Sequence, residues 1–426
     1  MYKINKHFLF NIIGIILFKI LLDYSYVYFI VDLFSYMGFT LNFNLLKYVQ
    51  SWIIIIIIFI LLYTKKKHIT YLMMLLVFLL LIVPTSTYYA FGGAKTGAFY
   101  IIILTYCMII LLLSTKKIHI KTIKQGKNIA IIISLAITFL VLVHYALVNG
   151  IFNINFDLTK VYDLREQYGK IQDSGLFGYL NSWTTKVLNV VLISLALLKR
   201  KYFYLILFVS IQIIIFGYSG HKLVLFSLLL IAGFYYFDRF KYQDTILIYS
   251  VLIFISLLVF VYYPLTKDII LPSILLRRAF FIPTQLNFIY MDFFSSHQFV
   301  YWSNSIFKFF LNYPYDIPPV HVIGRYLGHP KEAANTGIFG SGYMQLGMIG
   351  IIIYSLITII ILNLIQQFRT LPKWFVNAVL FNPILTLFIS SDLFTTLFTH
   401  GLLIAILVLY FFQGNLIFRT KKGYCI

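Results

Sequence analysis

The chain has 426 residues, of which 61% are hydrophobic, 19% aromatic and 11% charged, and its mean hydropathy is +0.91. Water-soluble domains average about 45–50% apolar and about 25% charged residues, so this composition excludes a soluble globular protein. The formal net charge is +21, from 34 Lys and Arg against 13 Asp and Glu. In a soluble chain this excess would suggest nucleic acid as a partner. Here the basic residues gather in connectors between apolar runs, which is typical of membrane topology signals, so no nucleic acid is expected.

The start of the chain and its cysteines narrow the class further. Met1–His7 contains two lysines and precedes a long apolar segment without a small-residue cleavage site, which predicts a retained first span rather than a removed signal peptide. The two cysteines, Cys107 and Cys425, are too few for a disulfide framework, and no metal-type spacing of Cys and His occurs. We therefore expect no structural disulfide and no metal.

Apolar windows of roughly 17–25 residues follow one another along the chain, each long enough to cross about 30 Å of hydrocarbon. They predict twelve transmembrane helices in an all-α polytopic membrane protein. The windows are about 8–28, 48–63, 69–90, 98–114, 128–148, 177–198, 202–218, 220–237, 245–264, 338–365, 374–391 and 393–413.

The charges of the connectors predict the orientation of these helices. If the N-terminus is cytoplasmic, the inner connectors hold 20 basic residues and only two acidic ones, Asp238 and Asp244. The outer connectors and span ends hold 13 basic and 11 acidic residues, and Lys19 lies within the first span. The positive-inside rule therefore predicts twelve spans with both termini in the cytoplasm.

Two outer segments are longer than ordinary connectors, and loops of that length are usually functional. They are residues 149–175 and residues 264–336, within a single integral membrane domain covering 1–426. The second is rich in proline, histidine and aromatic residues, which predicts short amphipathic helices at the membrane interface rather than a free loop.

Arginines in the longer segment are the sharpest candidates for binding an anion. Arg277 and Arg278 are adjacent, and Arg325 follows in Gly324-Arg325-Tyr326. A guanidinium is a permanently charged fork that suits phosphate oxygens, so these three residues are predicted to bind substrate. The alternative is that their side chains reach out to lipid headgroups from an interfacial helix.

Histidines and acids of the same segment are candidates for a general base. His321 and His329 flank Arg325 at four residues on either side, which on a continuous helix would place all three on one face. An imidazole with a near-neutral pKa suits removal of a proton from a hydroxyl group. Asp292, which stands among aromatic residues, is the acidic candidate, and His297, Asp316 and Glu332 are further ones. The sequence does not choose between them or exclude loop residues without a role.

Polar residues elsewhere add weaker candidates. Ser219-Gly220-His221-Lys222 interrupts two apolar helices, so His221 and Lys222 are predicted to face an outward cavity, and Asn335 is predicted to contact a sugar or phosphate. Asp392 and His400 are ionisable residues near the last two spans, where such groups usually face a cavity or a partner.

Lys19 and Asp23 are four residues apart and are expected to neutralise each other. The glycines between Gly337 and Gly350 are expected to permit close helix packing.

Taken together, these segments resemble the O-antigen polymerase (Wzy) family of bacterial oligosaccharide repeat unit polymerases. The resemblance rests on Ser219–Lys222, on Arg277–Pro283 running on to Asp292-Phe293-Phe294, and on Ala334–Gly337 leading to Gly342–Gly350. The layout of twelve spans with one dominant periplasmic loop before the tenth also fits. It implies a GT-C-like membrane glycosyltransferase in the bacterial inner membrane.

The resemblance implies a substrate and a reaction. A glycan on undecaprenyl diphosphate would be transferred, on the periplasmic face, to the terminal sugar of another undecaprenyl-diphosphate-linked unit, without nucleotide sugar, metal or cofactor. Membrane lipids are further partners, and whether a chain-length regulator binds stays open. An O-antigen ligase would share the topology and the arginines. A flippase or transporter needs no long outer loop and would be expected to carry its charges in a central cavity.

Overall fold

The computed structural model describes residues 6–116, 121–150, 154–156, 175–220 and 222–413. The part of the chain that it describes is helical and contains no β-strand, only an isolated bridge between Asn42 and Gly92. The prediction of an all-α class is confirmed.

Nine of the described helices are long and apolar enough to cross a membrane, as expected for a multi-pass membrane protein. They are Lys6–Met37, Leu45–Thr64, Tyr71–Phe91, Gly126–Asn149, Gly175–Leu198, Tyr202–Ser219, Gln243–Thr266, Ile338–Thr370 and Leu393–Phe412. Three shorter apolar helices cover Thr96–Leu111, Val224–Phe237 and Lys373–Ile389.

The chain divides into two compact units. Unit 1 comprises Met1–Thr115, Lys241–Asn363 and Leu387–Leu393, and unit 2 comprises Lys116–Phe240, Leu364–Thr386 and Phe394–Ile426. The helices of unit 1 are α1 (Lys6–Ser25), α2 (Val31–Phe34), α3 (Leu45–Thr64), α4 (Tyr71–Val77), α5 (Val83–Phe91), α6 (Thr96–Leu111), α13 (Gln243–Leu257), α14 (Tyr263–Thr266), α15 (Ile270–Pro272), α16 (Ile282–Phe294), α17 (Pro319–Tyr326) and most of α18 (Ile338–Ile365).

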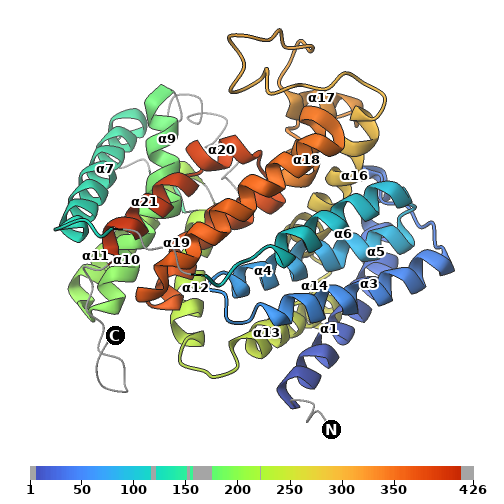
Figure 1. The fold of residues 1–426 in the computed structure, drawn as a ribbon, viewed down its shortest axis with the longest axis horizontal. Coiled ribbons are helices and arrows are strands. Elements are labelled where there is room, and N and C mark those ends of the chain that lie inside the picture. The colour runs from blue at the N-terminus through green and yellow to red at the C-terminus, as the bar shows by residue number, and fades with distance from the viewer. Residues whose placement is uncertain (1–5, 117–120, 151–153, 157–174, 221, 414–426) are drawn as a thin grey trace. The chain divides into compact units, whose positions relative to one another are not determined.

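The continuous helix formed by α4, a π-helical turn and α5 lies at the centre of unit 1. Its most apolar stretch is 94% buried, whereas that of α3 is only 28% buried. The helix α5 packs against α1, α3, α6 and α16, and Figure 1 shows α3, α5 and α6 running side by side. A helix hydrophobic on all sides is stable in such a position because protein surrounds it, while the apolar outer face of α3 suits lipid.

Two buried polar groups tie the helices of unit 1 together. Lys19 Nζ lies 2.5 Å from Asp23 Oδ1, which also accepts a hydrogen bond from Thr87 Oγ1 at 2.7 Å. The predicted pairing of Lys19 and Asp23 is therefore confirmed. Near the start of α1 and of α13, the buried carboxylate of Asp244 accepts from Lys66 Nζ at 2.8 Å. Buried charges in an apolar bundle are stable only when paired in this way.

The long segment before α18 is a folded part of unit 1. Its first part is helical from Ile270 to Phe294, through α15, a π-helical stretch Ser273–Phe281 and α16. Side chains of α16, α17, α18 and the segments between them form one hydrophobic core: Leu286, Tyr290, Phe293, Phe294, Val300, Val322, Ile323, Ala334 and Met344. Tyr290 donates to the carbonyl of Ala334 at 2.7 Å, which fixes the segment leading into α18.

The helix α18 is broken inside its apolar sequence. Leu346 and Gly347 have non-helical backbone angles, and Gly347 has φ +59°. Backbone N–H groups of Val300 and Tyr301 donate to the carbonyls of Met344 and Gln345, each at 3.0 Å. Carbonyls that the break removes from the helix ladder are thereby satisfied by another part of the chain, as a break at membrane depth requires.

Close packing at glycines also shapes this region, as expected. A Cβ at Gly337 would lie 1.9 Å from the carbonyl oxygen of Phe388, and one at Gly350 would lie 2.1 Å from the carbonyl oxygen of Gly342. Only glycine permits backbones to approach this closely.

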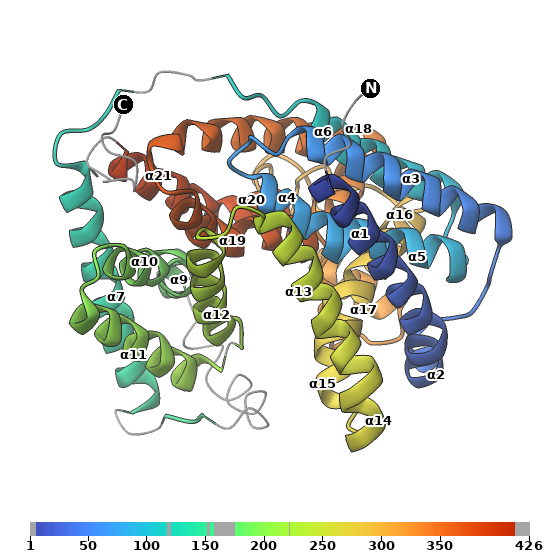
Figure 2. The ribbon, with the colours of Figure 1, turned by 90° about the horizontal axis from the view of Figure 1, so that it is seen from below.

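Unit 2 contains α7 (Gly126–Asn149), α9 (Gly175–Trp183), α10 (Asn189–Leu198), α11 (Tyr202–Ser219), α12 (Lys222–Phe237), most of α19 (Lys373–Ile389), most of α20 (Leu393–Phe398) and α21 (Leu402–Phe412). Figure 2 shows α7 beside α10 and α11, with which it is in contact. The buried amide of Gln212 on α11 bonds Asn189 at 2.6 Å and Ser227 at 3.0 Å, so it links α10, α11 and α12. The expected outer loop 149–175 lies mostly outside the described residues.

Candidate functional site

Two ion pairs and a group of aromatic rings come together where α16 and α17 meet in unit 1. We call this group the α16–α17 cluster; it consists of Lys95, Asp292, Phe293, His297, Tyr315, Asp316, Arg325 and Tyr326. The ring of Phe293 lies 5.2 Å from that of Tyr326 and 6.3 Å from that of Tyr315. Each of these rings is next in sequence to a member of an ion pair: Phe293 follows Asp292, Tyr315 precedes Asp316 and Tyr326 follows Arg325.

The first ion pair joins Asp292, near the end of α16, to Lys95, which directly precedes α6. The ammonium of Lys95 donates to the carboxylate of Asp292, and this hydrogen bond raises the pKa of Lys95. The Lys95 side chain is 74% exposed and that of Asp292 is 41% exposed, so a ligand can reach both. The pair thus offers a carboxylate, which can accept a proton, beside an ammonium, which can hold an anionic oxygen.

The second ion pair joins Asp316 to Arg325 on α17. The guanidinium donates from both terminal nitrogens to the two carboxylate oxygens, at 3.3 and 3.1 Å. This hydrogen bonding lowers the pKa of Asp316. An arginine has five N–H groups in a fixed fork, so the pair orients Arg325 and leaves N–H groups for an anion.

The histidines of this region occupy three different settings. His297 stacks on Phe293 with the ring centroids 3.9 Å apart, and its Nδ1 lies 2.8 Å from the carbonyl of Phe293. His321 is half-buried on α17, one helical turn before Arg325, so these two share a face as the spacing predicts. His329 is exposed beyond the end of α17, after Gly328 with φ +81°. A continuous helix would place His321, Arg325 and His329 on one face, but in the structure only His321 and Arg325 share a helix face.

The turn that carries His329 is held close to α17 by Gly324. A Cβ at Gly324 would lie 2.3 Å from the carbonyl oxygen of Glu332 and 2.9 Å from that of His329. His329 N–H also donates to the carbonyl of Gly324 at 2.8 Å. Although it is not on the helix, His329 is thus held beside it.

Arg277 and Arg278 differ sharply in their surroundings. Arg277 is buried, its Nε donates to Ser273 Oγ at 3.0 Å, and its guanidinium lies 4.6 Å from the centre of the Phe34 ring and against Met37. Arg278 is exposed. Arg277 and Asp292 are separated along the helical stretch 270–294 by on the order of 20 Å at about 1.5 Å per residue. The structure therefore does not bring Arg277 into the α16–α17 cluster.

The remaining predicted residues lie outside this cluster. Asn335 is exposed in the segment before α18, with its side-chain amide 3.5 Å from the carbonyl of Ala333. Lys222 begins α12 in unit 2. His221 lies outside the described residues.

Two features were not predicted from the sequence. Lys95 enters the site from a short connector, and its only sequence signal was that it is a basic residue in a connector predicted to face outward. The other feature is a chain of hydrogen bonds in which Trp302 Nε1 donates to Tyr354 Oη at 3.0 Å, and Tyr354 donates to Asp392 Oδ2 at 2.6 Å. Asp392 is thus held by a partner in unit 1, as intramembrane carboxylates usually are.

The described residues contain no group of three or more His, Cys, Asp or Glu that could hold a metal ion. The α16–α17 cluster itself offers ammonium, guanidinium, carboxylate and imidazole groups.

No protein-family model matches the chain, and no curated protein and no solved structure matches it either.

Proposed function

We propose that the protein polymerises repeat units of a surface polysaccharide, O-antigen or capsule. In this proposal it is a GT-C-like glycosyltransferase with twelve membrane crossings, and the three shorter apolar helices supply the crossings beyond the nine long ones. Undecaprenyl-diphosphate-linked oligosaccharide is both donor and acceptor. The supporting observation is the α16–α17 cluster, where two cations, exposed acids and sugar-sized aromatic faces meet in segments that the charge pattern assigns to the outer side.

The leaving group of this reaction is a lipid diphosphate, whose negative charge grows as its bond to the sugar breaks. Arg325 and Lys95 are partly exposed cations that suit this charge, and the exposed Arg278 is a further one. Losing one such donor typically costs about 10²–10³-fold in rate, because the donor acts where charge develops.

The acceptor sugar needs a base that removes a proton from its hydroxyl. Asp292, His321 and His329 remain the candidates, and the structure places Asp292 and His321 on the two helices that carry the cluster. Asp292 beside Lys95 is a carboxylate that a ligand can reach. Removing a positioned base typically lowers the rate by about 10²–10⁴-fold.

Arg277 has a different role in this proposal. Its buried guanidinium packs on Phe34, and Gln285 Nε2 donates to the carbonyl of Met37 at 3.1 Å. These contacts fix the segment after α2 against the stretch that carries Arg278. Arg277 is therefore a positioning residue, and Arg278 is the member of the pair that contacts substrate.

A host deleted for this gene tests the proposal through the banding pattern of its surface polysaccharide on a gel. The deletion strain should show core plus a single repeat unit, and wild-type protein should restore the ladder. Arg325→Ala and Arg278→Ala should fail to restore it at matched membrane levels. Lys308→Ala is the matched control, because Lys308 is an exposed basic residue of the same segment outside the cluster.

The other outcomes separate the alternatives. Loss of even the single-unit band would replace the polymerase by an O-antigen ligase or by a flippase or transporter. A normal ladder in the deletion strain would rule out the polysaccharide pathway altogether.

A further inference from the structure

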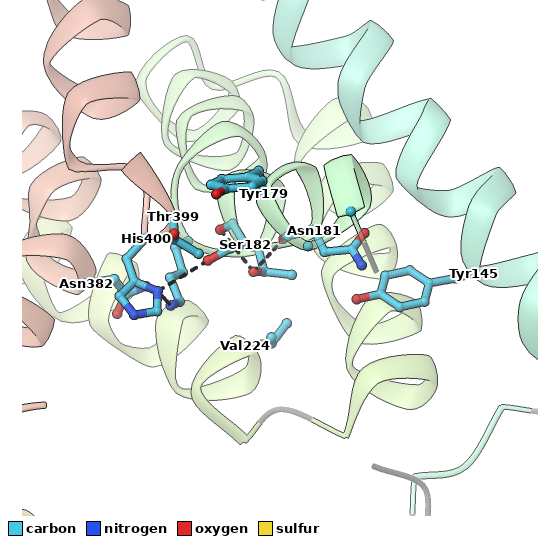
Figure 3. Close-up of a pocket in the computed structure, with 12 residues that line it drawn as sticks. Tyr145, Tyr179, Asn181, Ser182, Val224, Asn382, Thr399 and His400 are labelled. Atoms are coloured by element: carbon cyan, nitrogen blue, oxygen red, sulfur yellow. Dashed lines mark hydrogen bonds between the residues drawn. The ribbon is translucent and has the colours of Figure 1, made fainter. Parts of the chain in front are cut away.

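Unit 2 contains a cavity of about 470 Å³ that the α16–α17 cluster does not share (Figure 3). Its walls come from α7, from α9 with the π-helical turn Thr184–Leu188 that follows it, from α12, from α19 and from the connection between α20 and α21. The volume lies within the roughly 300–1,000 Å³ typical of sites for small molecules. Most of the side chains that line the cavity are polar, although the helices that carry them are apolar.

Two bases meet at one end of this cavity. Lys186 Nζ lies 2.5 Å from His400 Nδ1, and Ser182 Oγ lies 3.5 Å from the same nitrogen. Because an ammonium only donates, Nδ1 accepts, and the ring proton of the neutral imidazole is on Nε2. The imidazole can thus donate one further hydrogen bond, to an oxygen of a ligand.

Irregular backbone places both bases. Lys186 lies within the π-helical turn between α9 and α10, and His400 lies in the short break between α20 and α21, where Gly401 has φ +79°. Trp183 Nε1 donates to the carbonyl of Phe398 at 2.6 Å, which fixes this break against α9. Interrupted helices and π-turns inside membrane segments are frequent at binding sites.

Asn382 on α19 adds a buried acceptor at the same end. Its side chain is 4% exposed and lines the cavity, and its Oδ1 has no hydrogen-bond partner among the described residues. Figure 3 shows Asn382 next to His400, whereas Tyr145 lies at the opposite end. An unsatisfied buried acceptor is costly, so an acceptor in a cavity wall indicates a ligand that brings an O–H or N–H group.

We infer that this cavity binds a sugar residue. A sugar hydroxyl donates one hydrogen bond and accepts others. In the cavity wall, the side-chain oxygen of Asn382 can accept from such a hydroxyl. The groups that can donate to it are Lys186, His400 Nε2 and the hydroxyls of Ser182 and Thr399. The ring of Tyr179 supplies an apolar face for the C–H side of the sugar. This inference rests on the proposed function for the identity of the ligand as a glycan, and it assigns the chain a second glycan site separate from the α16–α17 cluster.

The test uses purified full-length protein in lipid nanodiscs and free methyl glycosides as probes, with binding measured by saturation-transfer NMR. The panel contains a neutral hexoside, an N-acetylhexosaminide and a hexuronide, so the preferred class is read directly. Wild-type protein should bind at least one of them. Asn382→Leu should weaken that binding about tenfold, as expected for the loss of a hydrogen bond in a buried site.

Asn377→Leu is the matched control. Asn377 also lies on α19, is 1% exposed and has an Oδ1 without a hydrogen-bond partner among the described residues, but it does not line the cavity. Its substitution should leave glycoside binding within twofold of wild type. If Asn382→Leu does not fold, as judged by size-exclusion profile and tryptophan fluorescence, Ser182→Ala replaces it and should weaken binding by a smaller factor.

Two results would overturn the inference: no glycoside of the panel binds wild-type protein, or the cavity variant and Asn377→Leu bind equally well. The gel assay of the deletion strain keeps the two proposals apart. A lost ladder without glycoside binding would remove the cavity site and keep the polymerase. Glycoside binding together with a normal ladder in the deletion strain would keep the cavity site and remove the polymerase.

Discussion

Two exposed carboxylates of unit 1 pair with cations of different kinds, and this difference predicts how each responds to substitution. Asp292 shares its carboxylate with the single point charge of Lys95, whereas Asp316 is held by both arms of the Arg325 fork. A bidentate pair fixes orientation, while a lysine pair can rearrange. Asp316 is therefore suited to positioning Arg325, and Asp292 to taking part in proton transfer.

If Asp292 is the base, Asp292→Asn should lower the polymerisation rate about 10²–10⁴-fold, because the amide cannot accept the proton. Lys95→Met should lower it less, since the carboxylate remains. The measurement is the rate of glycan elongation in membranes supplied with lipid-linked repeat units, normalised to protein level. Equal rates for Asp292→Asn and wild type would leave the role of base to His321 or His329.

The pH dependence of elongation identifies which group titrates. Pairing with Arg325 lowers the pKa of Asp316 below its ordinary value of about 3.9, so this pair is formed above that value and is lost only as the pH falls through the still lower folded pKa. Asp316 therefore stays ionised, and its pair with Arg325 stays formed, throughout the range from about pH 5 to about pH 8. Asp316→Asn should lower the rate without moving the pH profile.

An imidazole, by contrast, ordinarily titrates inside this window. A limb of the profile that rises between about pH 5.5 and 7.5 should therefore disappear in His321→Asn or His329→Asn if either is the base. A profile that keeps this limb in both variants would exclude the two histidines, and a limb that shifts in Asp316→Asn would contradict the assignment of that pair.

At the scale of the element, the break in α18 depends on one residue. Gly347 has φ +59° and ψ −138°, a conformation that residues with a Cβ rarely adopt, and a Cβ there would lie 3.1 Å from the Phe299 ring. The neighbouring turn is also strained, because Tyr301 and Trp302 have φ +53° and +57°. Backbone strain of this kind persists only where surrounding contacts hold it, here the hydrogen bond from Trp302 N–H to Gln345 Oε1 at 2.6 Å.

Gly347→Ala should accordingly destabilise the protein by about 1–3 kcal/mol, the usual cost of a strained backbone conformation. Gly97→Ala is the control, since Gly97 is helical in α6 and an added Cβ would meet nothing within 4 Å. Thermal unfolding in detergent, followed by the loss of monomeric protein on size exclusion, measures both. A Gly347→Ala variant as stable as Gly97→Ala would mean that the break is not conformationally required.

At the scale of the whole molecule, charge and hydropathy predict which connectors face the cytoplasm. The chain has only two cysteines, so Cys107→Ser together with Cys425→Ser provides a background for single-cysteine labelling. With twelve spans, a cysteine at Lys308 or Asn335 should react with an impermeant maleimide in intact cells from which the outer membrane barrier has been removed. One at Lys66 or Lys199 should react only after lysis. Labelling of Lys66 in intact cells would contradict the predicted orientation.

The all-helical class and the long apolar helices were predictable because hydrophobic runs are local signals. The pairing of Lys19 with Asp23 was predictable for the same reason, since four residues on a helix bring two side chains together. Lys95 and Asp292 are 197 residues apart, and only the packing of α6 near α16 brings them together. The cavity around Lys186 and His400 depends on a π-turn and a helix break, for which the sequence offers no periodic signal.

The break in α18 has a consequence for biogenesis. Gly347 lies nine residues after the start of the helix at Ile338, or about 14 Å along it at 1.5 Å per residue. The carbonyls of Met344 and Gln345 accept hydrogen bonds from the backbone of Val300 and Tyr301. Because synthesis proceeds from the N-terminus, Val300 and Tyr301 leave the ribosome before Met344. The backbone donors for the break are therefore already available when this helix enters the bilayer. We therefore expect the insertion of α18 to depend on prior folding of the segment upstream of it, because that segment supplies the hydrogen-bond donors at the break.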